Sequence, residues 1–251
     1  MFRKLFYILI LLFIYDEVFA QGFDWQYSAR LPSSSPSFFI GLTGEYNHLI
    51  HSGNLDFTEA QNSCATYTKG TGEGYSEGIR GEYWITGLLA FYGEILYVNS
   101  PGNFTVQAEP LPRIGQLLQT EYDFSTTMTY FLIEPGIKYR LFDSHFHAGA
   151  GLQIGFLMND NSIHKERIIG PDNAPPFPSG SYERIISDGK ISSLNTFFIE
   201  PRIQFGYDLT YGIGKYATPT ISIGIPVFDL TKSSGWKRWA FSAGLTIFLG
   251  I

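Results

Sequence analysis

The chain has 251 residues, of which 44% are hydrophobic, 17% are aromatic and only 16% are charged, and its net charge is −6. A negatively charged chain presents no basic surface to the phosphates of nucleic acid, so we expect no nucleic-acid partner. The single cysteine, Cys64, excludes an internal disulfide as a source of stability.

The N-terminus predicts export. Two basic residues precede an apolar run from Leu5 to Tyr15, and small residues stand where a signal peptidase cuts, after Ala20. The run is too short for a spanning helix, which needs ~20 residues. We therefore expect a cleaved signal peptide over residues 1–20. Residues 21–36 are expected to form a periplasmic N-terminal segment, either as a linker or as a segment that plugs or lines the lower mouth of the folded domain that follows.

Beyond residue 36, large apolar side chains alternate with small or polar ones in eight segments. A period of two indicates β-strands with two unlike faces. The last segment shows the pattern most clearly, with seven apolar residues at every second position from Trp239. The predicted strands cover Ser37–Asn47, Tyr75–Thr86, Leu88–Val98, Ser125–Leu141, His145–Met158, Asn195–Leu209, Ala217–Phe228 and Arg238–Ile251.

The connections between these strands alternate in length. Eight is an even number, so both ends of the chain would lie on the periplasmic side, with short periplasmic turns and long extracellular loops. The glycine-rich run from Gly70 to Gly78 is interpreted as a loop leading into the second strand. Short turns are expected near Gly87, at residues 142–144 and at 212–215, and longer loops at 47–75, 99–124, 159–194 and 229–236.

The volume of the barrel decides which face points outward. Eight strands leave an interior just wide enough for side chains, and four to six large apolar residues from each strand would overfill it. The face of small and polar residues fits that interior, so the apolar face must meet lipid. We predict an all-β fold, an eight-stranded antiparallel transmembrane up-and-down β-barrel over residues 37–251, located in the cell outer membrane.

Charged residues of the predicted inner faces would then be enclosed. Buried charges must be paired, because an unpaired charge in a narrow lumen is costly. Two strands share the tripeptide Ile-Glu-Pro, which predicts a similar depth for Glu134 and Glu200. The favoured interpretation is a structural ion-pair core, and the alternative is a narrow path for ions or protons. The predicted lumen network comprises Glu45, Arg80, Glu82, Glu94, Glu134, Lys138, Arg140, Glu200, Arg202 and Asp208.

A catalytic triad has few candidate histidines. His145 and His147 adjoin Asp143 and Ser144, but at a predicted periplasmic turn, far from the lipid A of the outer leaflet. His164, beside a serine, lies in the longest predicted loop, which offers no rigid scaffold. We therefore expect no catalytic residues and no enzyme activity, with a lipid-modifying enzyme as the second alternative.

Metal and cofactor sites are not predicted either. His145 and His147 share one face but lack a third ligand nearby in the sequence. His48 and His51 are predicted loop neighbours near Asp56 and a glutamate, which favours at most a surface site. No glycine pattern of a nucleotide-binding loop follows a strand and opens a helix.

Several motifs resemble a known family. They are the signal peptide, the Gly-x-x-Gly-Glu-Tyr start of the first strand at Gly41–Tyr46, the Gly70–Gly78 run, the two Ile-Glu-Pro strands and the tryptophan of the last strand. The chain resembles the outer membrane protein β-barrel domain family, often called PorT-like, of Gram-negative envelopes. The resemblance implies an eight-stranded barrel inserted by the barrel-assembly machinery. It carries over no catalytic or binding residue.

The expected function follows from this architecture. We expect an integral membrane protein with a filled lumen that acts structurally or through its extracellular loops, with a narrow pore as the alternative. Loop 159–194 is the best candidate contact surface, because long loops on rigid scaffolds often carry function. Its expected partners are outer-membrane lipid and lipopolysaccharide, the barrel-assembly machinery during insertion, and an unidentified surface protein or ligand.

Overall fold

The computed structural model describes residues 37–55, 66–113, 116–141, 144–171, 173–191, 193–212, 214–232 and 235–251. The predicted signal peptide, the segment 21–36 and Cys64 lie outside these residues. No helix in the described part of the chain is both long and apolar enough to cross a membrane.

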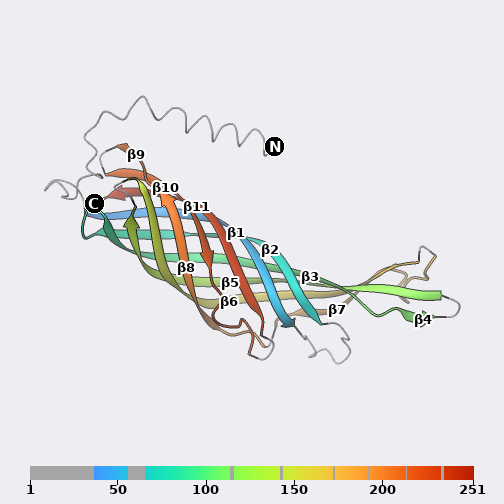
Figure 1. Cartoon of the computed structure of the whole chain (residues 1–251). Helices are drawn as coiled ribbons and strands as arrows, with labels where there is room; N and C mark the ends of the chain where they lie inside the picture. The colour runs from blue at the N-terminus through green and yellow to red at the C-terminus, as the bar shows by residue number, and fades with distance from the viewer. Residues whose placement is uncertain are drawn as a thin grey trace.

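Eight antiparallel strands close into a ring (Figure 1). The first and last strands seal it, with Leu42 opposite Ile247. The prediction of an eight-stranded up-and-down barrel is confirmed. In order around the ring the strands are β1 Phe38–Leu55, β2 Tyr67–Trp84, β3 Leu89–Gln107, β5 Gln116–Arg140, β6 Phe146–Gly170, β8 Phe197–Tyr207, β10 Lys215–Gly224 and β11 Lys237–Gly250.

Three short strands extend this ring. The first, β4 (Leu111–Arg113), pairs with β5, and the second, β7 (Glu183–Gly189), pairs with β6. The third, β9 (Leu209–Gly212), turns directly into β10 through Gly214, whose φ of +67° favours glycine. This last turn agrees with the short connection predicted at 212–215.

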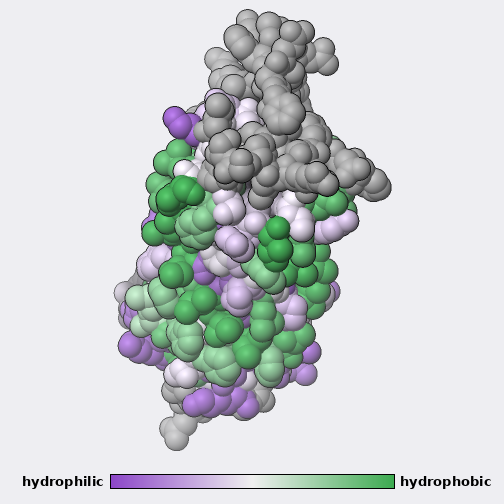
Figure 2. Space-filling view, turned by 90° about the vertical axis from the view of Figure 1, so that its left-hand side faces the viewer, coloured by the Kyte–Doolittle hydropathy of each residue, from purple (hydrophilic) through white to green (hydrophobic). Residues whose placement is uncertain are grey.

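The outside of the barrel is apolar, as a wall in lipid requires. Ile79, at 50% exposure, is typical of the outward positions, and Figure 2 shows apolar side chains over much of the visible surface. Aromatic residues mark both margins of this apolar belt. Toward the short turns they are Phe38, Tyr83, Phe91, Tyr139, Phe146 and Tyr207, and toward the loops Tyr46, Tyr75, Tyr97, Phe131, Phe156, Phe197 and Trp239.

On the loop side, β3, β5 and β6 continue past the belt and form, with β4 and β7, a projecting sheet that we call the ribbon (Figure 1). The predictions of loops at 99–124 and 159–194 are therefore wrong in part, because β3 runs to Gln107, β5 begins at Gln116 and β6 ends at Gly170. In the ribbon part of β5, apolar side chains such as Phe124 point inward and charged ones such as Asp123 point outward, whereas on β6 Asp160 and Glu166 are buried and Ile169 is exposed. In this part of β5 the polarity is the reverse of that in the belt.

The prediction of a loop at Gly70–Gly78 is also wrong, since these residues belong to β2. Here glycine permits close approach between strands rather than a turn. A Cβ at Gly72 would lie 1.9 Å from the carbonyl oxygen of Pro101 on β3. Strand β1 likewise extends to Leu55, into the loop predicted at 47–75.

The seventh predicted strand ends earlier than expected. Strand β10 stops at Gly224, and Pro226 follows, a residue that cannot donate to a β-ladder. Residues 225–232 and 235–236 instead cover the loop end of the barrel, where Leu230 and Trp236 are buried. The barrel mouth is therefore capped by its own chain.

The apolar belt predicts a depth-dependent cost for charge. Leu152, 40% exposed near the middle of the belt on β6, replaced by Arg should lower the free energy of unfolding by about 2–4 kcal/mol. Asn161→Arg, on the same strand beyond the belt, should change it by less than about 0.5 kcal/mol. Urea unfolding in lipid vesicles measures both, and equal effects would contradict the assigned belt.

Candidate functional site

The barrel interior has an apolar end, a charged middle and an apolar mouth. At the short-turn end, the buried side chains of Phe39, Trp84, Ala90, Tyr216 and Phe248 form one cluster, with Tyr216 stacked on Phe248 at 4.6 Å between ring centroids. All ten residues of the predicted network lie in the interior, none more than 8% exposed. The alternation of each strand places them there.

Lys138 joins the charged layer to the aromatic end. Its Nζ lies 2.8 Å from Asp208 Oδ1 and 3.2 Å from Glu82 Oε2, and it stands 5.3 Å from the centre of the Trp84 ring. The Tyr216 hydroxyl donates to Glu82 at 2.7 Å. The aromatic rings therefore shield a fully paired ammonium group from water, which strengthens its ion pairs.

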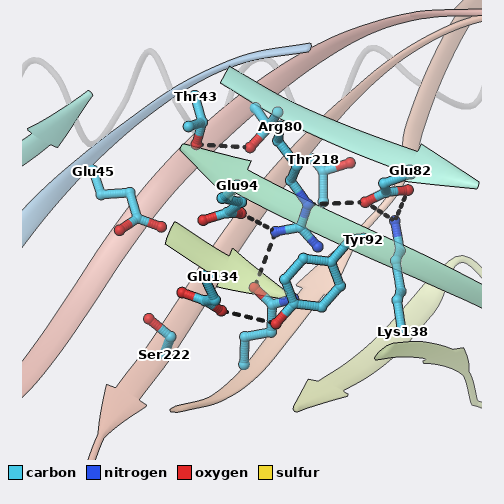
Figure 3. Close-up of polar contacts among 12 residues, drawn as sticks. Thr43, Glu45, Arg80, Glu82, Tyr92, Glu94, Glu134, Lys138, Thr218 and Ser222 are labelled. Atoms are coloured by element: carbon cyan, nitrogen blue, oxygen red, sulfur yellow. Dashed lines mark hydrogen bonds and ion pairs between the residues drawn. The ribbon is translucent and has the colours of Figure 1, made fainter. Parts of the chain in front are cut away.

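Arg80 spans the centre of the barrel (Figure 3). Its guanidinium pairs with Glu94 Oε1 at 2.6 Å and Glu82 Oε1 at 3.1 Å, and it stacks 4.1 Å above the Tyr92 ring. Its Nη1 also donates to Gln204 Oε1 at 3.1 Å. Strands β2 and β8 lie four steps apart in a ring of eight, so this hydrogen bond bridges opposite walls.

Arg202 makes the second crossing. Its Nη2 lies 2.6 Å from Glu45 Oε1 on β1, and its Nη1 lies 3.1 Å from Glu134 Oε2 on β5. Gln153 donates to the same Glu134 oxygen at 2.8 Å. One arginine thus ties three strands together across the lumen, and planar bidentate donors suit that task.

Arg238 is a member of the charged layer that the predicted network omitted. It lies 3.4 Å from Glu200 Oε2, donates to Ser100 Oγ at 2.9 Å, and stacks on Phe198 at 4.9 Å. The available signal was its place in β11, where it follows the inward alternation of Ser242 and Thr246. Glu134 and Glu200, predicted at similar depth, thus pair with different arginines.

The mouth is filled by apolar side chains and two buried histidines. Tyr67, Phe104, Phe124 and Trp236 belong to one buried cluster, and Tyr67 Oη lies 2.8 Å from His164 Nε2. A second buried histidine, His51, lies on β1 one residue past the apolar belt. It stands between β3 and residues 225–232 and 235–236, which we call the mouth loop. Together these residues close the loop end of the barrel over the charged layer.

His51 holds the mouth loop through both ring nitrogens. Its Nε2 donates to the Pro101 carbonyl at 3.0 Å, and its Nδ1 accepts from Trp236 Nε1 at 3.1 Å. Because a protonated ring has no acceptor nitrogen, this geometry requires the neutral Nε2–H form. Burial, aided by nearby Arg238, lowers the pKa of His51 from its ordinary 6.5 to about 4.

Asp143 and Asp56 lie outside the described residues, and among the described candidates the catalytic and metal residues do not assemble. His147 is buried with Nδ1 3.6 Å from Asp208 Oδ1, so it belongs to the charged layer. His164 and Ser162 lie on β6, which corrects their prediction as loop residues. His48 and His51 belong to β1, and three positions apart they face opposite sides, so they are not joint ligands. Among the described residues no cluster of metal ligands occurs.

The closed ring, apolar outside and ion-paired inside, defines a transmembrane β-barrel of the outer-membrane class. No protein-family model and no curated sequence matches the chain.

The similar solved structures include the following three. Neisserial surface protein A is 11% identical, with 86% of this chain and 97% of that chain covered and a TM-score of 0.37. The outer membrane protein AlkL is 10% identical, with 89% of this chain and 94% of that chain covered and a TM-score of 0.43. The attachment invasion locus protein Ail of Yersinia pestis is 8% identical, with 86% of this chain and 99% of that chain covered and a TM-score of 0.34. The assignment of the fold rests on the ring itself.

The lumen network predicts a large loss of stability when one partner is removed. Arg202→Met leaves Glu45 and Glu134 buried without their cation, which should cost about 3–5 kcal/mol. The double variant Glu45→Gln/Arg202→Met should recover part of this loss, because one uncompensated charge is gone. Urea unfolding in vesicles measures the cycle, and a negligible effect of the single variant would show that these charges are hydrated.

The mouth loop should loosen with acid. Because the pKa of His51 is lower in the closed mouth than in an open one, the stabilisation is complete above about pH 6.5 and is lost as the pH falls toward 4. Hydrogen-exchange protection of residues 225–232 and 235–236, corrected for intrinsic rates, should fall over this range. His51→Gln can donate and accept but cannot titrate, so it should lose little protection. Equal losses would assign the change to another group.

Proposed function

We propose that this protein is an integral outer-membrane barrel that serves as a rigid scaffold and presents the ribbon at the cell surface. The observation that carries the proposal is the combination of a lumen crossed by side chains with a sheet projecting past the apolar belt. The hydrogen bond between Arg80 and Gln204 spans opposite walls at 3.1 Å. Side chains that cross the lumen stiffen the barrel, and the ribbon that projects past the belt is the part that contacts other molecules.

The filled lumen argues against the alternative of a narrow pore. Charged side chains link β2, β3 and β8 in the middle, and separate apolar clusters occupy both ends. An ion entering this path would have to displace buried rings as well as ion pairs. His147 lies beside Asp208 in the charged layer and His164 lies against Tyr67 in the mouth, which supports a scaffold over a lipid-modifying enzyme.

The remaining assignments complete the proposal. The export signal over residues 1–20 would deliver the chain to the periplasm, and the barrel-assembly machinery would insert it. The sequence motifs favour a divergent relationship to the PorT-like barrels. Outer-membrane lipid and lipopolysaccharide would surround the apolar belt, and an unidentified surface protein or ligand would contact the ribbon.

The pore alternative is tested by conductance. Reconstituted into planar bilayers, the protein should show no steady single-channel openings, because side chains cross the charged layer and buried rings occupy both ends of the lumen. The same preparation must show a heat-dependent gel shift, which proves that the barrel is folded. Reproducible openings of uniform size would overturn the proposal of a filled lumen.

The surface role is tested on the ribbon. Replacing residues 109–119 by a short Gly-Ser turn removes the tip beyond the pairing of Gln107 with Glu121 and leaves the barrel pairs intact. Binding of nanodisc-embedded protein to intact cells of the source strain should fall at least about tenfold, whereas the gel shift should persist. Undiminished binding would exclude the tip as the contact surface.

A further inference from the structure

Two lysines flank one serine on the outer wall of the barrel. Ser52 on β1 lies opposite Lys69 on β2 and also opposite Lys237 on β11, so the three residues form one row across adjacent strands. Both lysines are exposed and Ser52 is half-buried. Strand spacing places the lysine backbones about 10 Å apart, so both flexible stems can reach a group lying over Ser52.

The row adjoins the apolar belt on β11 and lies farther past the aromatic margin on β1 and β2, where that margin is at Tyr46 and Tyr75. Two residues nearer the membrane, Ile50 stands opposite Trp239, and these side chains are 39% and 37% exposed. A step of two residues along a strand is about 7 Å. The ammonium group of Lys237 therefore sits just past the aromatic margin, at the depth where the headgroups of a bilayer begin, and Lys69 lies farther out on β2, beyond Tyr75.

The two positive charges are not neutralised by the described residues. No described carboxylate forms an ion pair with Lys69 or Lys237. The nearest acid on this face, Glu73, is already occupied: it accepts from the Tyr46 hydroxyl, and its Oε1 lies 2.8 Å from His48 Nδ1. The chain carries a net charge of −6, so two neighbouring lysines without a carboxylate partner among the described residues stand out from its overall charge.

We propose that Lys69, Ser52 and Lys237 bind the phosphate of a lipid in the outer leaflet. The lysines supply charge, the serine hydroxyl supplies a hydrogen-bond donor, and the acyl chains of the same lipid lie against Ile50 and Trp239. Charge complementarity selects a phosphorylated headgroup, and the apolar row below selects a lipid over free phosphate. This inference rests on the proposed outer-membrane location, which puts the loop end of the barrel in the outer leaflet.

The test uses the full mature chain in a non-ionic detergent, titrated with bisphosphorylated lipid A and observed by native mass spectrometry. The wild-type protein should bind this lipid more tightly than its dephosphorylated form. Each surface lysine contributes about a fivefold gain in binding of anionic lipid, so Lys69→Gln/Lys237→Gln should bind about thirtyfold more weakly. Inorganic phosphate at millimolar concentration should compete poorly.

The matched control is Lys190→Gln/Lys215→Gln, which removes the same charge from two exposed lysines outside the row. It should bind the lipid as the wild type does. An equal loss in both double variants, or no loss in the first, would overturn the site. Strong competition by inorganic phosphate would overturn the assignment to lipid. If the gel shift persists in every variant, such a failure leaves the outer-membrane barrel itself unaffected.

Discussion

The narrowness of an eight-stranded ring is the constraint on which the rest of this structure depends. Such a ring has no room for a water column wide enough to solvate its inward charges, so each inward cation must find carboxylates close by, most of them on other strands. Arg80 and Arg202 reach across the lumen for this reason, and aromatic rings at both ends keep water away from them. The apolar side chains that do not fit inside form the outer belt, and the belt fixes the depth at which the projecting sheet begins.

Alternation in the sequence was sufficient to predict the ring but not the ribbon. In the belt, apolar residues such as Leu152 point outward, and counting such positions gave eight strands and their faces. In the ribbon, β5 continues with the opposite polarity, with Phe124 inward and Asp123 outward, and the buried positions of β6 include Asp160 and Glu166. A search for lipid-facing alternation ends where the pattern changes, which is why 99–124 and 159–194 were predicted as loops. The change itself marks where the strands leave the lipid.

The sequence was sufficient to predict which charged residues face the interior, but not which of them form ion pairs with one another. Each of the ten charged residues could be assigned to the inner face from its own strand. Partners could not be assigned, because contact across the lumen depends on the stagger between strands, and a local pattern does not contain that quantity. Glu134 and Glu200 share a motif yet bind Arg202 and Arg238. Arg238, which interrupts the small or polar residues of the inner face of its strand, was not included in the predicted network.

The seam between β1 and β11 has a consequence for how the chain reaches this state. The seam joins residues about 200 positions apart, such as Leu42 and Ile247, and the Glu45–Arg202 pair spans 157 positions. Contacts this remote in sequence make folding slow, because the entropy of closing so long a loop is lost before any contact is gained. Ion pairs that cross the lumen, such as Glu45–Arg202, therefore form late in assembly, whereas Arg80 and Glu82, two positions apart on β2, can pair early.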